Sequence, residues 1–149
     1  MLGELAQNEI ESLLQSQVIG RIGCCDANEV FVVPITYAYD GTCIYGHSKE
    51  GTKIKMMRNN PSVCFEVDAT TSMTNWKSVI LTSTYEEITD PAQRQVAMKI
   101  FSYRMRPFIA SETIAPMIRQ PEPHPAGATY KPIVFRIKVL KKTGRYERT

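Results

Sequence analysis

The sequence predicts a small, mainly β protein built around an antiparallel barrel. Six segments rich in β-branched and aromatic residues follow one another along the chain. Most of them are separated by short turn sequences, which favours antiparallel hairpins over parallel crossovers. The segment 29–40 is apolar on both faces, so both faces require cover from a closed sheet, a partner subunit or a ligand. A small closed barrel fits these three observations best.

The N-terminal part is expected to be one helix followed by two strands. Leucine and isoleucine recur at near-helical spacing over residues 3–16, which predicts an amphipathic helix. Residues 18–25 and 29–40 have strand-like composition and are joined by the turn sequence DANE. Pro34 lies in the middle of the second strand and cannot donate a ladder hydrogen bond. It therefore predicts a sheet edge or a bulge.

The middle of the chain predicts a hairpin, a short basic helix and another strand. The Asp-Gly pair at 40–41 is a tight-turn sequence, so we expect residues 42–48 to pair back on the preceding strand. Residues 51–60 predict the basic helix, which Pro61 ends because a residue before proline avoids helical backbone angles. Residues 62–68 alternate strictly, which predicts a strand with Val63, Phe65 and Val67 inward.

The C-terminal half is expected to add two strands and a second helix. Residues 76–88 predict a long strand, after a polar loop. The Asp-Pro pair at 90–91 is typical of a helix start, with aspartate as N-cap and proline in the first turn. The proline-rich segment 106–131 is expected to be an ordered loop with one short helix after Ser111, and residues 132–142 predict the last strand. The second helix is expected to turn one face to the core, formed by Ala92, Val96, Ile100 and Phe101.

Composition and charge limit the possible classes of protein. The 149 residues are 43% hydrophobic and 22% charged, which fits one domain, 1–149, with a substantial core. The net charge of +3 is small and scattered, so we expect no nucleic-acid partner. No apolar run could span a bilayer and no basic residue precedes Arg21, so we expect no membrane partner and a cytoplasmic location. The cysteines lack metal-site spacing, so we expect no metal and free thiols at Cys24, Cys25, Cys43 and Cys64.

The start of the 51–60 helix is a candidate anion site. A helix N-terminus carries partial positive charge and backbone N–H groups without intrahelical partners, and such an end binds phosphate readily. Gly51 would allow close approach, Thr52 would offer a hydroxyl and Lys53 a full charge; Lys55 or Arg58 could strengthen the field. A short basic helix facing water fits the same spacing. His47, at the end of the preceding strand, fits either a structural or a catalytic role.

Five motifs in this order carry a resemblance to a known family: V-P-I-T-Y-A-Y, Y-G-H-S, G-T-K-I, N-P-x-V-C-F-E-V-D and W-x-S-V. From about residue 4 to 140, the sequence resembles the pyridoxamine 5′-phosphate oxidase-like family of flavin-binding split barrels. More narrowly, it resembles the nitroimidazole-resistance-protein (NimA-like) branch. The resemblance implies a homodimer of six-stranded antiparallel Greek-key split barrels with flanking helices, and FMN in the groove between the subunits.

The resemblance also implies a set of cofactor contacts. One strand would line the edge of the isoalloxazine ring, while two residues after the hairpin turn would lie beside the ring and ribityl chain. The helix start would hold the 5′-phosphate, and two residues of the long strand would approach the cofactor or the dimer seam. From its residue type alone, the tryptophan is expected to be a core or interface aromatic. In this order the residues are Val33, Pro34, Ile35, Thr36 and Tyr37; His47 and Ser48; Thr52 and Lys53; and Trp76 and Ser78.

Three functions follow from these expectations. The first is an FMN-dependent oxidoreductase, like a flavin reductase or nitroreductase, that acts on an unknown small molecule with His47 as the candidate catalytic residue. The second is a non-catalytic flavin or haem binding or storage protein, with His47 or His124 as a possible axial ligand. The third is a pyridoxamine 5′-phosphate oxidase, although the C-terminal half lacks a matching set of basic residues for that substrate.

Overall fold

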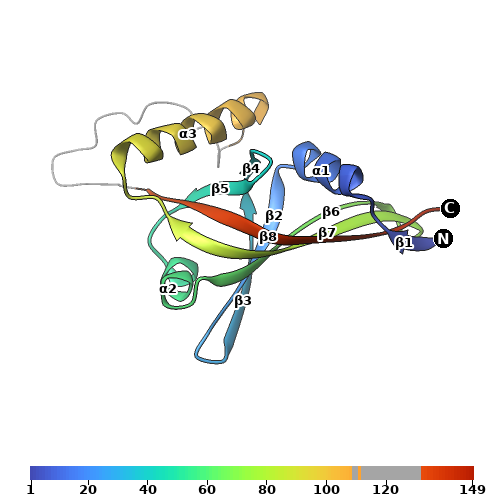
Figure 1. Cartoon of the computed structure of the whole chain (residues 1–149), viewed down its shortest axis with the longest axis horizontal. Coiled ribbons are helices and arrows are strands. Elements are labelled where there is room, and N and C mark those ends of the chain that lie inside the picture. The colour runs from blue at the N-terminus through green and yellow to red at the C-terminus, as the bar shows by residue number, and fades with distance from the viewer. Residues whose placement is uncertain (109–110, 112–131) are drawn as a thin grey trace.

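A computed structural model describes residues 1–108, 111 and 132–149. Three α-helices and eight strands are formed by these residues, in one antiparallel sheet (Figure 1). The strands are β1 Leu2–Glu4, β2 Ile19–Asp26, β3 Glu29–Thr36, β4 Ala38–Tyr39, β5 Cys43–Ser48, β6 Ser62–Ser72, β7 Asn75–Glu87 and β8 Ile133–Glu147. The helices are α1 Gln7–Ser16, α2 Thr52–Asn59 and α3 Pro91–Met105, followed by a 3₁₀ turn, Arg106–Phe108.

The expected strand count of six is wrong, because the sheet has eight strands. The six predicted strands are present, and the two additional ones are short. β1 pairs with the end of β8 and overlaps the start of the segment predicted as helix, so α1 begins only at Gln7. β4 is the end of the predicted strand 29–40, which is interrupted at Tyr37. β6 and β8 also continue beyond their predicted ends, to Ser72 and Glu147.

The sheet curls into a barrel that stays open at one place. Its strand order is β3-β2-β6-β7-β8-β5-β4, with β1 on β8. The first and last strands of this order, β3 and β4, are neighbours in sequence and are joined by Tyr37. Within the described residues no ladder pairs β3 with β4 or β5, so the barrel is split there. The predicted hairpin after Asp40 is confirmed, with Ala38 opposite Tyr45.

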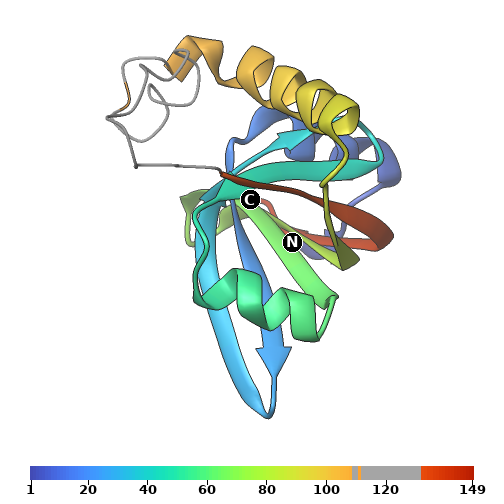
Figure 2. The same ribbon diagram turned by 90° about the vertical axis from the view of Figure 1, so that its left-hand side faces the viewer.

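The core fills the inside of the curled sheet. The inward residues predicted for β6 are confirmed, because Val63, Phe65 and Val67 are all buried. Figures 1 and 2 show α1 and α2 near opposite ends of the curled sheet. Both helices contribute to the same cluster of buried side chains, which includes Ile10, Leu13 and Leu14 of α1 and Ile54, Met56 and Met57 of α2. Every helix in the described part of the chain is too short or too polar to cross a membrane.

Helix α3 starts as predicted but turns a different face inward. The Asp90 carboxylate accepts a hydrogen bond from the Gln93 N–H at 3.0 Å, which confirms the N-cap. The buried residues are Ala97, Phe101 and Met105, whereas Val96 is 59% exposed. α3 lies over the outer side of the sheet near β4, β5 and β8 (Figure 2). The face that α3 buries is therefore set by the side chains of those strands, such as Ala38, and not by the helix pattern alone.

Strand β3 is an edge strand, as Pro34 predicted. The β2–β3 hairpin extends away from the barrel (Figures 1 and 2) and turns through Ala27 and Asn28, whose φ angles of 49° and 66° are left-handed. Along this hairpin Val30 and Val32 are 74% and 64% exposed. The expected cover on both faces is therefore not supplied by the described part of a single chain.

Candidate functional site

Helix α2 begins at Thr52, close to the predicted start, and has no side-chain cap there. Its N-cap residue, Gly51, has extended backbone angles and provides no side-chain cap. Thr52, the first helical residue, is exposed. The early N–H groups of a helix have no intrahelical acceptors, and the dipole adds partial positive charge at this end. The start of α2 can therefore receive an anion.

Lys53 adds a full charge at the same place. Its ammonium group is half-buried and donates a hydrogen bond to Ser48 Oγ at 2.7 Å. Burial lowers the pKa of Lys53, against a small opposite effect of the nearby Cys24 thiol. Among the described residues no carboxylate lies within 4.0 Å of this amine. Because a half-buried charge without a counterion is unfavourable, the arrangement fits a site for an anionic ligand.

Arg58 does not contribute to this site. Its guanidinium forms ion pairs with Glu87, at 2.9 Å from Nε to Oε1, and with Glu50. These bonds attach α2 to the end of β7. The expectation that Arg58 could strengthen the field at the helix start therefore does not hold, because two carboxylates neutralise it.

His47 lies on β5, next to Ser48 and beneath α3. It is opposite Val134 of β8, and its ring meets the Phe101 ring edge to face at a centroid distance of 4.9 Å. Burial, together with the charge of Lys53, lowers the pKa of His47 to about 4. The imidazole is therefore neutral near pH 7, with one ring nitrogen as donor and the other as acceptor. Phe101 is a residue of this site that sequence reasoning assigned only to a helix face.

The end of β3 approaches β5 from the other side of the split. A methyl group added to Gly46 would lie 3.5 Å from Ile35 Cδ1 and 2.9 Å from Phe135 Cζ. Glycine in a strand interior is a signal for such a close approach. Pro34 and Thr36 lie on the outer face, beside Arg21 and Ile19 of β2. Val33 and Ile35 are half-buried on the opposite face of β3.

The side chain of Tyr37 is not available to a ligand, contrary to expectation. It is only 1% exposed. Its hydroxyl donates a hydrogen bond to Leu14 O at 2.8 Å, and its ring packs edge to face on Phe65. Tyr37 therefore holds α1 to the barrel.

Trp76 and Ser78 lie at the other end of β7. Trp76 Nε1 donates a hydrogen bond to Glu147 at 3.1 Å, and Ser78 Oγ donates one to Glu66 at 3.4 Å. Glu87, which meets α2 through Arg58, is eleven residues further along the strand, or about 36 Å at 3.3 Å per residue. One protomer does not bring Trp76 and Lys53 together. His124, the other histidine, falls outside the described residues.

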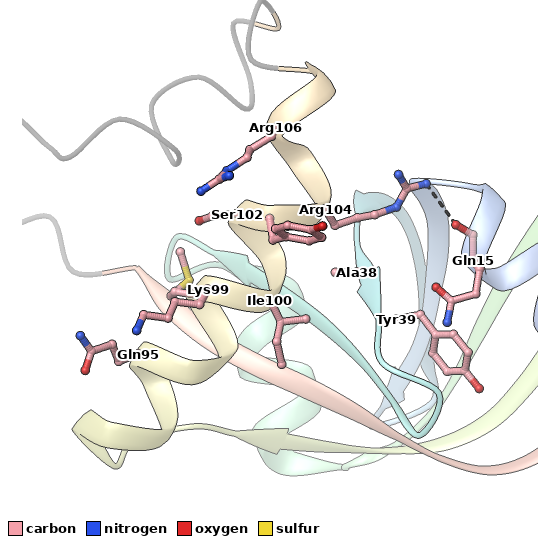
Figure 3. Close-up of a pocket in the computed structure, with 11 residues that line it drawn as sticks. Gln15, Ala38, Tyr39, Gln95, Lys99, Ile100, Ser102, Arg104 and Arg106 are labelled. Atoms are coloured by element: carbon pink, nitrogen blue, oxygen red, sulfur yellow. Dashed lines mark hydrogen bonds between the residues drawn. The ribbon is translucent and has the colours of Figure 1, made fainter.

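A hollow of about 920 Å³ lies against α3, and none of the predicted site residues lines it. Figure 3 shows Gln95, Lys99, Ser102 and Arg106 along one side of the helix, with Gln15, Ala38 and Tyr39 on the other side. Its polar groups do not converge on one point. Arg104 donates to the carbonyl oxygen of Gln15 at 3.1 Å and so holds the end of α1. We therefore place the candidate site at His47, Ser48 and Lys53.

Comparisons with known proteins agree with this fold. A FAD-binding protein from Mesorhizobium loti has a TM-score of 0.74 and 27% identity, covering 100% of this chain and 98% of that one. A FAD-binding protein from Mycobacterium smegmatis has a TM-score of 0.69 and 24% identity over 99% of both chains. A Bacteroides thetaiotaomicron protein described as a 5-nitroimidazole antibiotic resistance protein has a TM-score of 0.71 and 19% identity, covering 98% and 87%.

Comparisons of the sequence identify the family. An uncharacterised protein of Rhizobium meliloti (strain 1021) is 34% identical over 84 residues, and the match spans 56% of each chain. The family model for pyridoxamine 5′-phosphate oxidase matches residues 6–145, nearly the whole sequence. The chain therefore belongs to the pyridoxamine 5′-phosphate oxidase family, as its motifs indicated.

Proposed function

We propose that this protein is an FMN-dependent oxidoreductase that acts on a small molecule. The observation that carries the proposal is Lys53, a half-buried cation without a carboxylate partner among the described residues, at the open start of α2. A terminal phosphate is the anion that such a helix end favours. The FAD-binding descriptions of the M. loti and M. smegmatis proteins support a flavin. A single cation at the helix start favours FMN among flavins.

The residues of the site would have separate roles in binding and in orientation. Thr52 and Lys53, with the first N–H groups of α2, would hold the phosphate, and Ser48 orients the ammonium through its hydrogen bond. The ends of β3 and β5 would line the flavin ring. Bound flavin would supply the electron-transfer chemistry, while the protein supplies position and electrostatics. His47, neutral and held against Phe101, would offer a hydrogen bond to the ring or the substrate.

The proposal includes a homodimer with the site between the subunits. Trp76 and Ser78 belong to the predicted site but lie far from Lys53 within one protomer. They could meet the same ligand only across an interface. The exposed valines of β3 also require a cover that the described part of the chain does not provide. We place the protein in the cytoplasm, where its four free cysteines would remain reduced.

An absorbance spectrum of the pure protein, before and after anaerobic reduction, tests the proposal. A yellow protein whose colour is lost on reduction and restored by an acceptor would support it. Separation of the heat-released cofactor identifies FMN or FAD. A Soret band would instead indicate haem, and flavin that no acceptor reoxidises would indicate a non-catalytic binding protein. Turnover of pyridoxamine 5′-phosphate with peroxide release would indicate the vitamin B6 oxidase.

A further inference from the structure

Helix α3, with the short turn that follows it, is basic and lies at the periphery of the molecule. Residues 91–108 contain four basic residues and no aspartate or glutamate, although the net charge of the whole chain is only +3. Figures 1 and 2 show α3 on the outer side of the sheet. This segment therefore has an excess of positive charge and no negative charge of its own. Its basic residues are Arg94, Lys99, Arg104 and Arg106.

These four cations have no acidic partner in the described part of the chain. Every ion pair found there involves other basic residues. Arg104 donates to the carbonyl oxygen atoms of Gln15 and Ser16 at 3.1 and 3.4 Å. Arg94 donates to the carbonyl oxygen of Pro132 at 3.0 Å. Neutral oxygen atoms fix the position of a guanidinium but leave its charge uncompensated, so the positive field of α3 can attract an acidic partner.

The outward face of this segment combines charge with exposed apolar side chains. Val96, Lys99, Tyr103 and Arg106 follow one another at intervals of three or four residues, which places them on one helix face. Val96 and Tyr103 are 59% and 75% exposed, and both cations are exposed as well. The Arg106 guanidinium lies 5.8 Å from the centroid of the Tyr103 ring. Tyrosine and arginine are enriched at protein interfaces, whereas two apolar side chains give little area for membrane binding. The face therefore fits an acidic protein.

Helix α3 also lies between this outward face and the candidate site. On its inner side Phe101 meets the ring of His47, with 4.9 Å between the ring centroids. His47 is followed directly by Ser48, the hydrogen-bond partner of Lys53. A helix with its side chains is about 10–12 Å wide. A protein docked on the outward face is therefore about one helix diameter from His47.

We propose that the outward face of α3 docks a small acidic protein that carries one electron at a time. This inference rests on the proposed function and names the class of its electron donor. Two reduced carriers each give one electron and leave oxidised, and two protons from water complete the reduction of one bound flavin. One helix offers only a small surface, and weak, transient redox complexes use interfaces of this kind. Opposite charges speed the encounter of such partners.

Calorimetric titration with a plant-type ferredoxin, an acidic one-electron carrier, tests the docking surface. We expect a complex at low ionic strength that weakens as salt screens the charges. Lys99→Glu and Arg106→Glu should each raise the dissociation constant about 10-fold. Lys55→Glu, the same charge reversal at an exposed position of α2, should leave it nearly unchanged. Absence of a complex at low salt, or an equal loss with Lys55→Glu, would overturn the inference. Binding to phosphatidylserine vesicles in place of ferredoxin would overturn it too, because the face would then serve a membrane.

Reduction of the bound flavin separates a failure of this inference from a failure of the proposed function. In the FMN-loaded protein we expect pre-reduced ferredoxin to bleach the flavin absorbance in stopped-flow mixing. At subsaturating carrier the rate should fall about 10-fold in Lys99→Glu and stay the same in Lys55→Glu. If dithionite bleaches the flavin but reduced ferredoxin does not, the carrier is wrong and the flavin-binding function stands. If the protein binds no flavin, the proposed function is wrong and the electron-donor role falls with it.

Discussion

Replacing Lys53 by methionine should weaken FMN binding without destabilising the ligand-free protein. The ammonium is half-buried, has one hydrogen bond, to Ser48 Oγ, and has no carboxylate within 4.0 Å among the described residues. Burial already lowers its pKa, so the charged form is disfavoured before a ligand arrives. Methionine has a similar length and removes that desolvation cost. The two effects of the substitution should therefore have opposite signs.

The magnitude follows from the bond that would be lost. A hydrogen bond to a charged group contributes about 1.5–3 kcal/mol. This range corresponds to a dissociation constant for FMN raised about 10- to 150-fold. The free energy of unfolding of the ligand-free protein should stay the same or increase, because the half-buried charge is removed.

Fluorescence titration of apoprotein with FMN measures this effect, with riboflavin as the matched ligand that lacks the phosphate. Lys53→Met should raise the dissociation constant for FMN and leave that for riboflavin nearly unchanged. Lys55→Met, a substitution of an exposed lysine on the same helix, is the control and should change neither value. Equal FMN affinity of wild type and Lys53→Met would refute the assignment of the phosphate to this position. An equal loss for riboflavin would show that Lys53 acts on another part of the ligand.

Three further substitutions test the fold around the site. In the folded protein His47 stays neutral down to about pH 4, whereas in the unfolded chain it takes up a proton near pH 6.5. The free energy of unfolding should therefore fall by about 3 kcal/mol as the pH is lowered from 6.5 to 4. Urea unfolding should show a weaker pH dependence for His47→Gln. Gly20→Ala should destabilise the protein by about 1–3 kcal/mol in thermal unfolding, because the new methyl would lie 2.3 Å from Phe65 Cζ. Tyr37→Phe should cost about 1–3 kcal/mol and leave the affinity for FMN unchanged, since its buried hydroxyl donates to Leu14 O.

The features that the sequence predicted well depend on near neighbours in the chain. The turn after Asp40, the inward residues of β6 and the Asp90 N-cap are each determined by a few adjacent residues. The inward face of α3 was not predictable in this way. Several apolar residues lie on that helix, and the choice of Ala97 over Val96 depends on the strands beneath it.

The same distinction explains the candidate site. The positive start of α2 follows from Gly51 and Lys53, which are close in sequence. The neutralisation of Arg58 by Glu87 depends on a strand 29 residues away, and no local pattern indicates it. The burial of Tyr37 was not predictable either, because its hydroxyl donates to a backbone oxygen of α1, which carries no sequence signal. The position of Trp76 at the far end of β7 depends on the full register of the sheet.

The split in the barrel and the candidate site have a common physical origin. Pro34 cannot donate a ladder hydrogen bond, and Tyr37 breaks the strand to place its ring in the core. Within the described residues no ladder joins β3 to β5, although Gly46 allows Ile35 to approach. β5 ends beside this opening and leads directly into α2, whose first turn places Lys53 against Ser48. A barrel closed by hydrogen bonds here would have covered the same polar groups. The open edge, the uncapped helix start and the cation without a carboxylate partner among the described residues thus all favour a ligand in one place.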